Sequence, residues 1–316
     1  MIKKKATREA YGETLAALGA KYPELVVLDA DLSGSTKSGE FAKLYPERFY
    51  NMGIAECNMI GVAAGLAAAG KKPFASSFAM FISGRAFEQI RNSVAYPRLN
   101  VKCVGSHGGL SVGEDGATHQ CLEDFAVMSS IAGMTVLCPC DANEMKCAIE
   151  ALIEYDGPAY VRLGRMGVDT VTAEAKNYSF TLGRGAQLRE GHDLSFIACG
   201  LMVQEALKAA EILSEEGISA RVIDMHTIKP VDGEIIKKAA LETGLIITAE
   251  EHNIHGGLGS QVASFTAENC PVRVLRHGVE DRFGRSGKPK EVLEFFGLTA
   301  EALAEKARYG LKLKER

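Results

Sequence analysis

Short apolar runs alternate along the first half of the chain with longer stretches in which apolar positions recur at helical spacing. The runs predict strands at residues 25–28, 73–76, 101–104, 135–137 and 159–163. The longer stretches predict helices at residues 8–18, 55–69, 84–95, 122–131 and 143–153. Strands that alternate with helices in this way favour a parallel sheet covered by helices.

The alternation lapses between residues 166 and 193, where the sequence is polar and rich in glycine. We therefore predict a linker at residues 171–192, between a first domain at 1–170 and a second at 193–316. The second domain has predicted strands and helices at 194–199, 203–215, 220–223, 233–241, 245–249, 258–267 and 272–275. The predicted fold class is α/β, with two doubly wound parallel-sheet domains of which the second is smaller. In such sheets ligands bind beyond the carboxyl ends of the strands.

Composition and charge exclude several classes of function. The 316 residues are 47% hydrophobic and 24% charged, with a net charge of -4, so the basic surface that binds nucleic acid is missing. No apolar run is long enough for a membrane span, and no apolar stretch follows the basic start as it would in a secretory signal. The eight cysteines lack zinc-site spacing, which favours reduced, buried thiols and no metal ligands in this chain. We expect a cytoplasmic protein without nucleic-acid or membrane partners.

A glycine-rich loop with titratable side chains follows the strand predicted at residues 101–104. It contains His107, His119, Glu114 and Asp115. Glycine lets a backbone approach a ligand closely, and histidines and carboxylates exchange protons near pH 7. A polar surface loop without function and a metal site are the alternatives. The density of titratable groups after a strand favours a functional site.

Two further segments and two arginines are candidates for chemistry. Glu56 enters the first turn of an otherwise uncharged helix, where the helix dipole favours a carboxylate. An exposed carboxylate is the alternative, but apolar neighbours favour a buried, paired one. Phe78 and Phe81 follow a predicted strand and can stack on a flat heterocycle, although such rings more often belong to a core. Arg162 and Arg165 end another strand, where arginine suits an anion.

Two of these segments resemble motifs of the transketolase family. Residues 113–120 (GEDGATHQ) are similar to the family signature, and residues 53–56 (GIAE) are similar to the turn that carries its catalytic glutamate. The resemblance covers the whole chain and corresponds to the second half of a full-length transketolase, the pyrimidine-binding domain followed by the C-terminal domain. Gly84 stands where the family usually has a third aromatic ring, and Ala117 replaces a common proline. Both departures concern the pyrimidine pocket and the choice of donor.

The resemblance implies thiamine diphosphate as cofactor and a role for each matching residue. Glu56 would bond N1′ of the pyrimidine ring and favour its imino tautomer, while phenylalanines pack on the ring. The implied catalytic residues are Glu56, His107, Asp115 and His119, the last two in contact with the hydroxyls of the donor sugar. The implied cofactor-binding residues are Glu56, Phe78, Phe81 and Asp31. The implied substrate-phosphate residues are Arg8, Ser35, Arg165 and His107.

The family holds the diphosphate and a divalent metal on a separate domain with a GDG motif and a downstream asparagine. The sequence lacks this motif. The resemblance thus implies a split transketolase in which this chain is the C-terminal subunit. Its partner would be an N-terminal subunit that carries the diphosphate domain and the ligands of Mg²⁺ or Ca²⁺, in an α2β2 assembly. The implied reaction transfers a two-carbon ketol unit between sugar phosphates of the pentose phosphate pathway.

Other proteins share parts of this pattern. A 1-deoxyxylulose-5-phosphate synthase-like enzyme has the glutamate turn and a similar loop, but His107 followed by the full loop at residues 111–120 resembles transketolase more. A split transketolase for a specialised sugar is a further alternative. The beta subunit of a 2-oxoacid dehydrogenase has the same layout but lacks the sugar-phosphate residues, so Arg8, Ser35 and Arg165 argue against it. A non-catalytic assembly subunit is disfavoured by the retained Glu56 and histidines.

Overall fold

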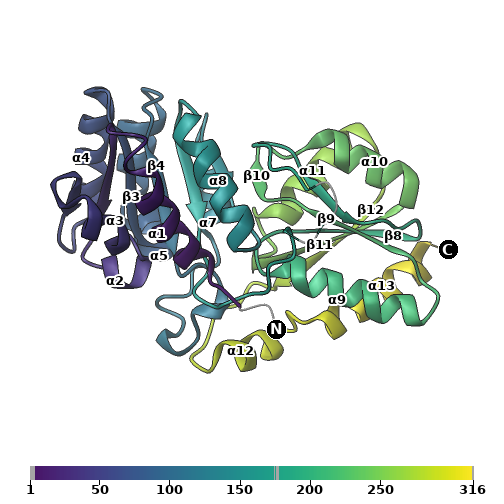
Figure 1. Cartoon of the computed structure of the whole chain (residues 1–316). Coiled ribbons are helices and arrows are strands. Elements are labelled where there is room, and N and C mark those ends of the chain that lie inside the picture. Colours follow the sequence, from purple (N-terminus) through teal and green to yellow (C-terminus); the bar gives the residue numbers. More distant parts are fainter. Residues whose placement is uncertain (1–3, 174, 176–177, 315–316) are drawn as a thin grey trace.

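Two sheets, each covered by helices on both faces, lie side by side in the computed structural model, which describes residues 4–173, 175 and 178–314 (Figure 1). The first sheet has seven strands in the order β10-β5-β6-β4-β3-β1-β2, and the second has five in the order β12-β11-β8-β9-β7. The predicted α/β class with two doubly wound domains is confirmed. Both sheets are mixed, because each has one antiparallel strand at its edge.

The first sheet is built mainly from the first half of the chain. Its strands are β1 (Leu25–Asp29), β2 (Phe49–Asn51), β3 (Lys72–Phe78), β4 (Lys102–Ser106), β5 (Thr135–Leu137), β6 (Ala159–Arg162) and β10 (Thr227–Lys229). One face is covered by α1 (Thr7–Leu18), α3 (Gly39–Leu44) and α8 (Ala142–Glu154). The other is covered by α4 (Glu56–Ala68), α5 (Ala79–Arg85) and α7 (Asp124–Ser129). Shorter turns are α2 (Ser33–Thr36), α6 (Phe87–Gln89), a 3-10 turn at Pro46–Arg48 and a π-helical turn at Ile90–Ala95.

Strand β1 shows why these runs are apolar throughout. All five of its residues are buried. Leu25 and Val27 pack with α1 and α8, whereas Val26 and Leu28 pack on the opposite face with α4. The first four residues of β1 meet an apolar core on one face or the other, so their sequence is a continuous apolar run without alternation.

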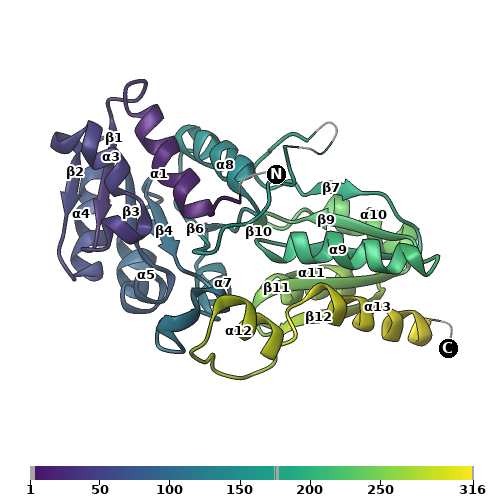
Figure 2. The ribbon, with the colours of Figure 1, turned by 60° about the horizontal axis from the view of Figure 1, so that its bottom comes forward.

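The second sheet repeats this arrangement with the second half of the chain. Its strands are β7 (Ala186–Arg189), β8 (Leu194–Ala198), β9 (Ala220–Asp224), β11 (Leu245–Asn253) and β12 (Arg273–Val279). Helices α9 (Met202–Glu215) and α13 (Ala300–Lys314) cover one face, and α10 (Gly233–Thr243) and α11 (Leu258–Asn269) cover the other. The remaining helix, α12 (Pro289–Phe295), lies beside the loop that follows β4 (Figure 2).

The structure differs from the predicted elements mainly where strands are short. β7 lies within residues 171–192 and pairs with β9, and β10 leaves the second half of the chain to pair with β5 of the first sheet. Three or four residues carry too little periodicity to indicate a strand, so only tertiary pairing identifies them. The helix predicted at 84–95 is divided into α6, the π-helical turn and the end of α5. The domain boundaries stay a prediction.

No helix in the described part of the chain is both long enough and apolar enough to cross a bilayer.

Candidate active site

The candidate site forms where β3 and β4 end side by side. Phe78, the last residue of β3, pairs in register with Ser106, the last residue of β4. The backbone then turns sharply at His107, whose φ of 59° is in the left-handed region. Parallel strands deliver their carboxyl ends to one edge of the sheet, which is where ligands of such folds bind. The glycine-rich loop after β4 therefore lies against the end of β3.

Four aromatic and imidazole rings from these segments are in contact. The rings of Phe78 and His107 stack with centroids 4.1 Å apart, and those of Phe78 and Phe81 stack at 5.7 Å. His119 meets the Phe81 ring edge-on at 5.4 Å. Phe78 is buried and Phe81 is half-buried, so the group presents an accessible, flat apolar surface. We call these four residues the ring cluster.

Glu56 lies next to the ring cluster as the first residue of α4. Its side chain is only 3% exposed, in agreement with the expectation of a buried, paired carboxylate. The Ser77 hydroxyl donates to Oε1 at 3.1 Å, and Nη1 of Arg85 lies 3.3 Å from Oε2. The Arg85 guanidinium also stacks over the Phe81 ring at 4.4 Å. Arg85 could not be singled out from the sequence, because one cation in a helix carries no signal of its own.

Arg8 and Arg165 lie close enough to His107 for their charges to act on it. Arg8 donates to the backbone carbonyl of Ser35 at 2.7 Å, so the main chain of Ser35 makes this contact. Arg165 donates to the carbonyl of Val112 and to the Glu114 carboxylate. Burial lowers the pKa of His107 to about 3, with a further contribution from the positive charges of the two arginines. His107 is therefore neutral, and a cationic region suited to an anion lies beside it.

Two other predicted residues lie on exposed turns. Asp31 has a φ of 64° and accepts a hydrogen bond from the Asn51 amide at 2.9 Å. Asp115 is exposed within the 3-10 helix η3 (Leu110–Asp115). Within the described ranges neither carboxylate bonds to the ring cluster. Their assignment to cofactor and sugar stays a prediction.

Arg162, expected as a possible anion ligand, instead pairs with a carboxylate in the protein interior. It is buried, and its Nε donates to Oδ2 of Asp124 at 2.9 Å, with a second bond from Nη2 to Oδ1. The Tyr160 hydroxyl donates to the same carboxylate at 2.7 Å. Burial alone would raise the pKa of Asp124, but the charge and hydrogen bonds of Arg162, together with His252 and Tyr160, outweigh burial and lower it. A fully paired guanidinium has no role as a free anion site, so that expectation was wrong.

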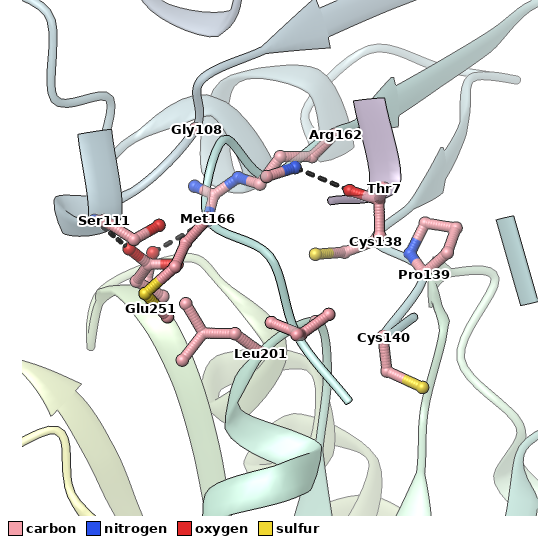
Figure 3. A pocket seen from close by; sticks show the side chains of 13 residues that line it. Thr7, Gly108, Ser111, Cys138, Pro139, Cys140, Arg162, Met166, Leu201 and Glu251 are labelled. Carbon is pink, nitrogen blue, oxygen red and sulfur yellow. Dashed lines mark hydrogen bonds between the residues drawn. The ribbon is translucent and has the colours of Figure 1, made fainter. Parts of the chain in front are cut away.

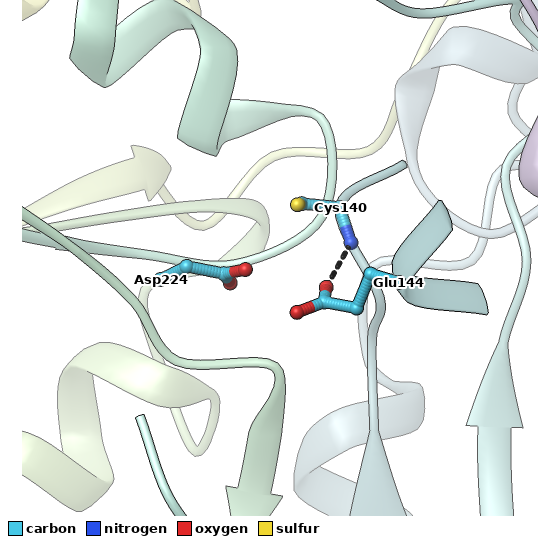
Figure 4. Close-up of side chains that lie close together, drawn as sticks. All are labelled: Cys140, Glu144 and Asp224. Carbon is cyan, nitrogen blue, oxygen red and sulfur yellow. Dashed lines mark hydrogen bonds between the residues drawn. The ribbon is translucent and has the colours of Figure 1, made fainter. Parts of the chain in front are cut away.

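A buried acidic cluster, separate from this site, joins residues of the two domains (Figure 4). Glu144 accepts from the Cys140 amide at 2.6 Å and from the Tyr178 hydroxyl at 2.5 Å. Asp224 approaches from the end of β9, and burial together with the Glu144 carboxylate raises its pKa well above the usual range. Neither oxygen of Asp224 has a hydrogen-bond partner among the described residues, so the position suits a neutral, protonated carboxyl better than a buried charge.

Comparison with known proteins identifies the family. The model of the transketolase pyrimidine-binding domain matches residues 3–169, and the model of the transketolase C-terminal domain matches residues 183–303. The chain belongs to the transketolase family. It corresponds to the C-terminal section of a split transketolase, and the family implies thiamine diphosphate as cofactor.

Relatives of this transketolase chain match it over nearly its whole length. It is 52% identical over 309 residues to a Methanocaldococcus jannaschii chain whose name assigns it provisionally as a transketolase C-terminal section, covering 98% of this chain and 97% of that one. It is 44% identical to a subunit of 6-deoxy-6-sulfo-D-fructose transketolase from Clostridium sp., covering 95% and 92%. A solved structure described as an inactive beta4 tetramer of a split-gene transketolase has a TM-score of 0.91 and 50% identity, covering 98% and 99%.

Proposed function

We propose that this chain is the catalytic C-terminal subunit of a split, thiamine-diphosphate-dependent transketolase that transfers a two-carbon ketol unit between sugar phosphates. One observation carries the proposal. A buried carboxylate, a flat apolar surface and a cationic region meet at the carboxyl ends of two parallel strands. The carboxylate and the flat surface suit a pyrimidine ring, and the cationic region suits the anionic end of a sugar phosphate.

Arg85 provides a test of whether the site fits the cofactor. Its planar guanidinium stacks on Phe81 at 4.4 Å while its Nη1 lies 3.3 Å from the Glu56 carboxylate. An aminopyrimidine has the same two features, a flat face and a hydrogen-bonding edge. Because 54% of the Arg85 side chain is exposed, it can move into water when a ring takes its place. This observation supports Glu56, Phe78 and Phe81 as the residues that hold the pyrimidine.

The proposed chemistry divides between cofactor and protein. When bound, thiamine diphosphate supplies the nucleophilic carbon and electron sink for cleaving a carbon–carbon bond beside a carbonyl. Glu56 would hold a proton with N1′ of the ring, a task that needs an ionisable group within hydrogen-bonding distance. The buried position of Glu56 excludes water from that bond.

The two histidines share a feature that prepares them to bind a sugar. Nδ1 of His107 is 2.7 Å from the hydroxyl of Ser106, and Nδ1 of His119 is 2.9 Å from the hydroxyl of Thr118. In each case the preceding residue fixes one ring nitrogen, which leaves Nε2 to bond to a substrate hydroxyl. We assign His119, with Asp115, to the hydroxyls of the donor sugar and His107 to the acceptor phosphate, and both histidines to the proton transfers that accompany ketol transfer.

The arginines are assigned to the anionic end of the substrate. Nε of Arg8 is buried without a hydrogen-bond partner among the described residues. Burial lowers the pKa of Arg8, and the nearby charge of Arg165 adds to the lowering. An anion between them would satisfy the donor and relieve the repulsion of like charges. Each charge-assisted contact contributes about 1.5–3 kcal/mol.

We further propose that the diphosphate, with Mg²⁺ or Ca²⁺, binds to an N-terminal subunit in a cytoplasmic α2β2 assembly. Asp31, on the exposed turn after β1, is assigned to the cofactor at that boundary. The names of relatives of equal length, a C-terminal section and a subunit, support this division. Sugar phosphates of the pentose phosphate pathway are the proposed substrates.

A transketolase for a specialised sugar is the second candidate. One relative acts, by its name, on 6-deoxy-6-sulfo-D-fructose, whose terminal anion is a sulfonate. Arg8 and Arg165 form a cationic region that suits either anion, because both sulfonate and phosphate accept hydrogen bonds from guanidinium groups. The two arginines therefore indicate a sugar with an anionic group, but they do not distinguish phosphate from sulfonate, which other residues of the pocket must do.

The test is to co-express this chain with a candidate N-terminal subunit and to measure ketol transfer with thiamine diphosphate and Mg²⁺. Xylulose 5-phosphate and ribose 5-phosphate are the first donor and acceptor, and 6-deoxy-6-sulfo-D-fructose is the alternative donor. Turnover of the phosphorylated pair supports the proposed function, and turnover only of the sulfonated donor supports the second candidate. A correctly assembled complex that transfers no ketol unit from either donor overturns both.

A further inference from the structure

The C-terminal domain holds the loop that carries the two histidines. Nε2 of Gln120, at the end of this loop, donates to the backbone carbonyl of Arg285 at 2.9 Å. The amide of Ser111, at the start of η3, donates to Glu251 Oε1. Arg162 of the first domain donates to the Glu251 carbonyl at 2.7 Å, and α12 packs on η3. Both ends of the loop are thus fixed by residues outside their own domain.

Three glycines let the loop approach the C-terminal domain this closely. Gly109, Gly113 and Gly116 have φ values of 83°, 79° and 76°, which disfavour any other residue. A Cβ at Gly109 would overlap the Glu251 carboxyl group, and one at Gly113 would lie 2.8 Å from Pro289. The backbone path between His107 and His119 is therefore shaped against the second domain.

Glu251 is buried in the cavity between the domains, where its carboxylate points toward Ser111 (Figure 3). Its neighbour Glu250 is equally buried, at 1% exposure against 7% for Glu251. Glu250 accepts from the amides of Leu258 and Gly259 at 2.7 and 2.8 Å, at the start of α11 in its own domain. A buried carboxylate is costly unless it is hydrogen-bonded. The donors to Glu250 belong to its own domain, whereas the donor to Glu251 is the Ser111 amide in the loop of the candidate active site.

We propose that Glu251 is a positioning residue whose carboxylate binds the Ser111 amide and fixes the loop between His107 and His119. The C-terminal domain thereby completes the active site of the first domain. The first amides of a helix have no partner within it, and a carboxylate is the preferred acceptor there. Without that acceptor, a loop with three left-handed glycines has many accessible conformations.

The effect on activity follows from geometry, and this inference rests on the proposed function. A displacement of about 1 Å in a catalytic group can lower the rate about 100-fold. Glu251→Ala removes the acceptor, and Glu251→Asp keeps the charge but shortens the reach by one methylene group. Glu251→Gln keeps the reach and one acceptor oxygen. We expect kcat to fall roughly 10- to 100-fold for Ala and Asp, with Gln recovering most of the loss.

The matched control is the same three substitutions at Glu250. All variants are assembled with the N-terminal subunit, and kcat, KM and the unfolding temperature are measured. Hydrogen exchange is followed in peptides covering residues 107–121 and 257–262. Glu251→Asp should speed exchange only in the first peptide, and Glu250→Asp only in the second. Both should lower the unfolding temperature, but only the Glu251 variant should lower kcat.

Two outcomes would overturn the inference. One is a Glu251→Asp complex with wild-type exchange at 107–121 and wild-type kcat. The other is an equal loss of kcat at Glu250 and Glu251, which would make both residues merely structural. The Asp and Gln variants keep the test decisive if either Ala variant does not fold. Absence of ketol transfer in the wild-type complex would instead count against the proposed function, since the exchange measurements still test the contact itself.

Discussion

Replacing Glu56 should abolish most turnover while leaving the fold intact. The Ser77 bond to its carboxylate is 3.1 Å long and buried, and the change to Gln exchanges a charged acceptor for a neutral one at a cost of about 1 kcal/mol. In the ion pair with Arg85 the arginine side chain is 54% exposed, so loss of the pair costs about 0–1 kcal/mol. The α4 dipole adds about 0.3–1 kcal/mol. Removal of a buried charge offsets part of this sum.

The catalytic effect is expected to be larger. A positioned proton-transfer group contributes roughly 10²- to 10⁴-fold, which corresponds to about 3–5 kcal/mol in the activation barrier. A stability of about 5–15 kcal/mol, the usual range for a folded domain, survives the smaller structural cost. Glu56→Gln should therefore unfold within a few degrees of the wild type and turn over at least about 100-fold more slowly.

The assay is deuterium exchange at C2 of thiamine diphosphate in the assembled complex, followed by NMR, together with thermal unfolding. Glu144→Gln is the control, because Glu144 is also a buried carboxylate in the first turn of a helix but lies in the cluster between the domains. Deuterium exchange at C2 should slow in the Glu56→Gln complex and should stay at the wild-type rate in the Glu144→Gln complex. Wild-type C2 exchange in a folded Glu56→Gln complex would refute the assignment of this glutamate.

Four further outcomes are expected. The purified chain with thiamine diphosphate and Mg²⁺ but no partner should show no ketol transfer, and robust turnover would contradict the split-subunit proposal. Arg8→Ala and Arg165→Ala should raise KM about 10-fold or more for phosphorylated substrates, and equal losses with unphosphorylated analogues would show that both arginines are structural. The ring of His107, whose pKa burial lowers to about 3, should remain neutral from pH 5 to 9 by NMR, and a titration near pH 6.5 would contradict that environment. Asp224 has a raised pKa, so it binds its proton more tightly when folded, and stability is lost as pH rises from about 4 toward the raised value. Asp224→Asn should flatten that decline in thermal unfolding, and parallel curves for the variant and the wild type would refute the raised pKa.

The local pattern of the sequence determined the architecture, because a strand that is buried on both faces is a continuous run of apolar residues. The run 25–28 predicted β1 and the run 245–249 predicted the first half of β11, since every residue of both runs is buried. The order of the GIAE and GEDGATHQ segments was enough to indicate the family. For Glu56, the apolar neighbours in its helix indicated a buried, paired carboxylate.

Contacts between distant segments were decided only by the tertiary structure. Nothing near Arg162 in the sequence indicates that Asp124 neutralises it. Its position at the end of a strand therefore suggested an anion site. Arg85 reaches Glu56 because α5 turns back beside α4, and β10 reaches β5 across about 90 residues of chain. Glu250 and Glu251 are adjacent glutamates, and nothing in the sequence distinguishes their roles. The pleat of β11 sends their side chains to opposite faces, one toward α11 and the other toward the catalytic loop, and only the packing of the two domains gives the second its place at the site.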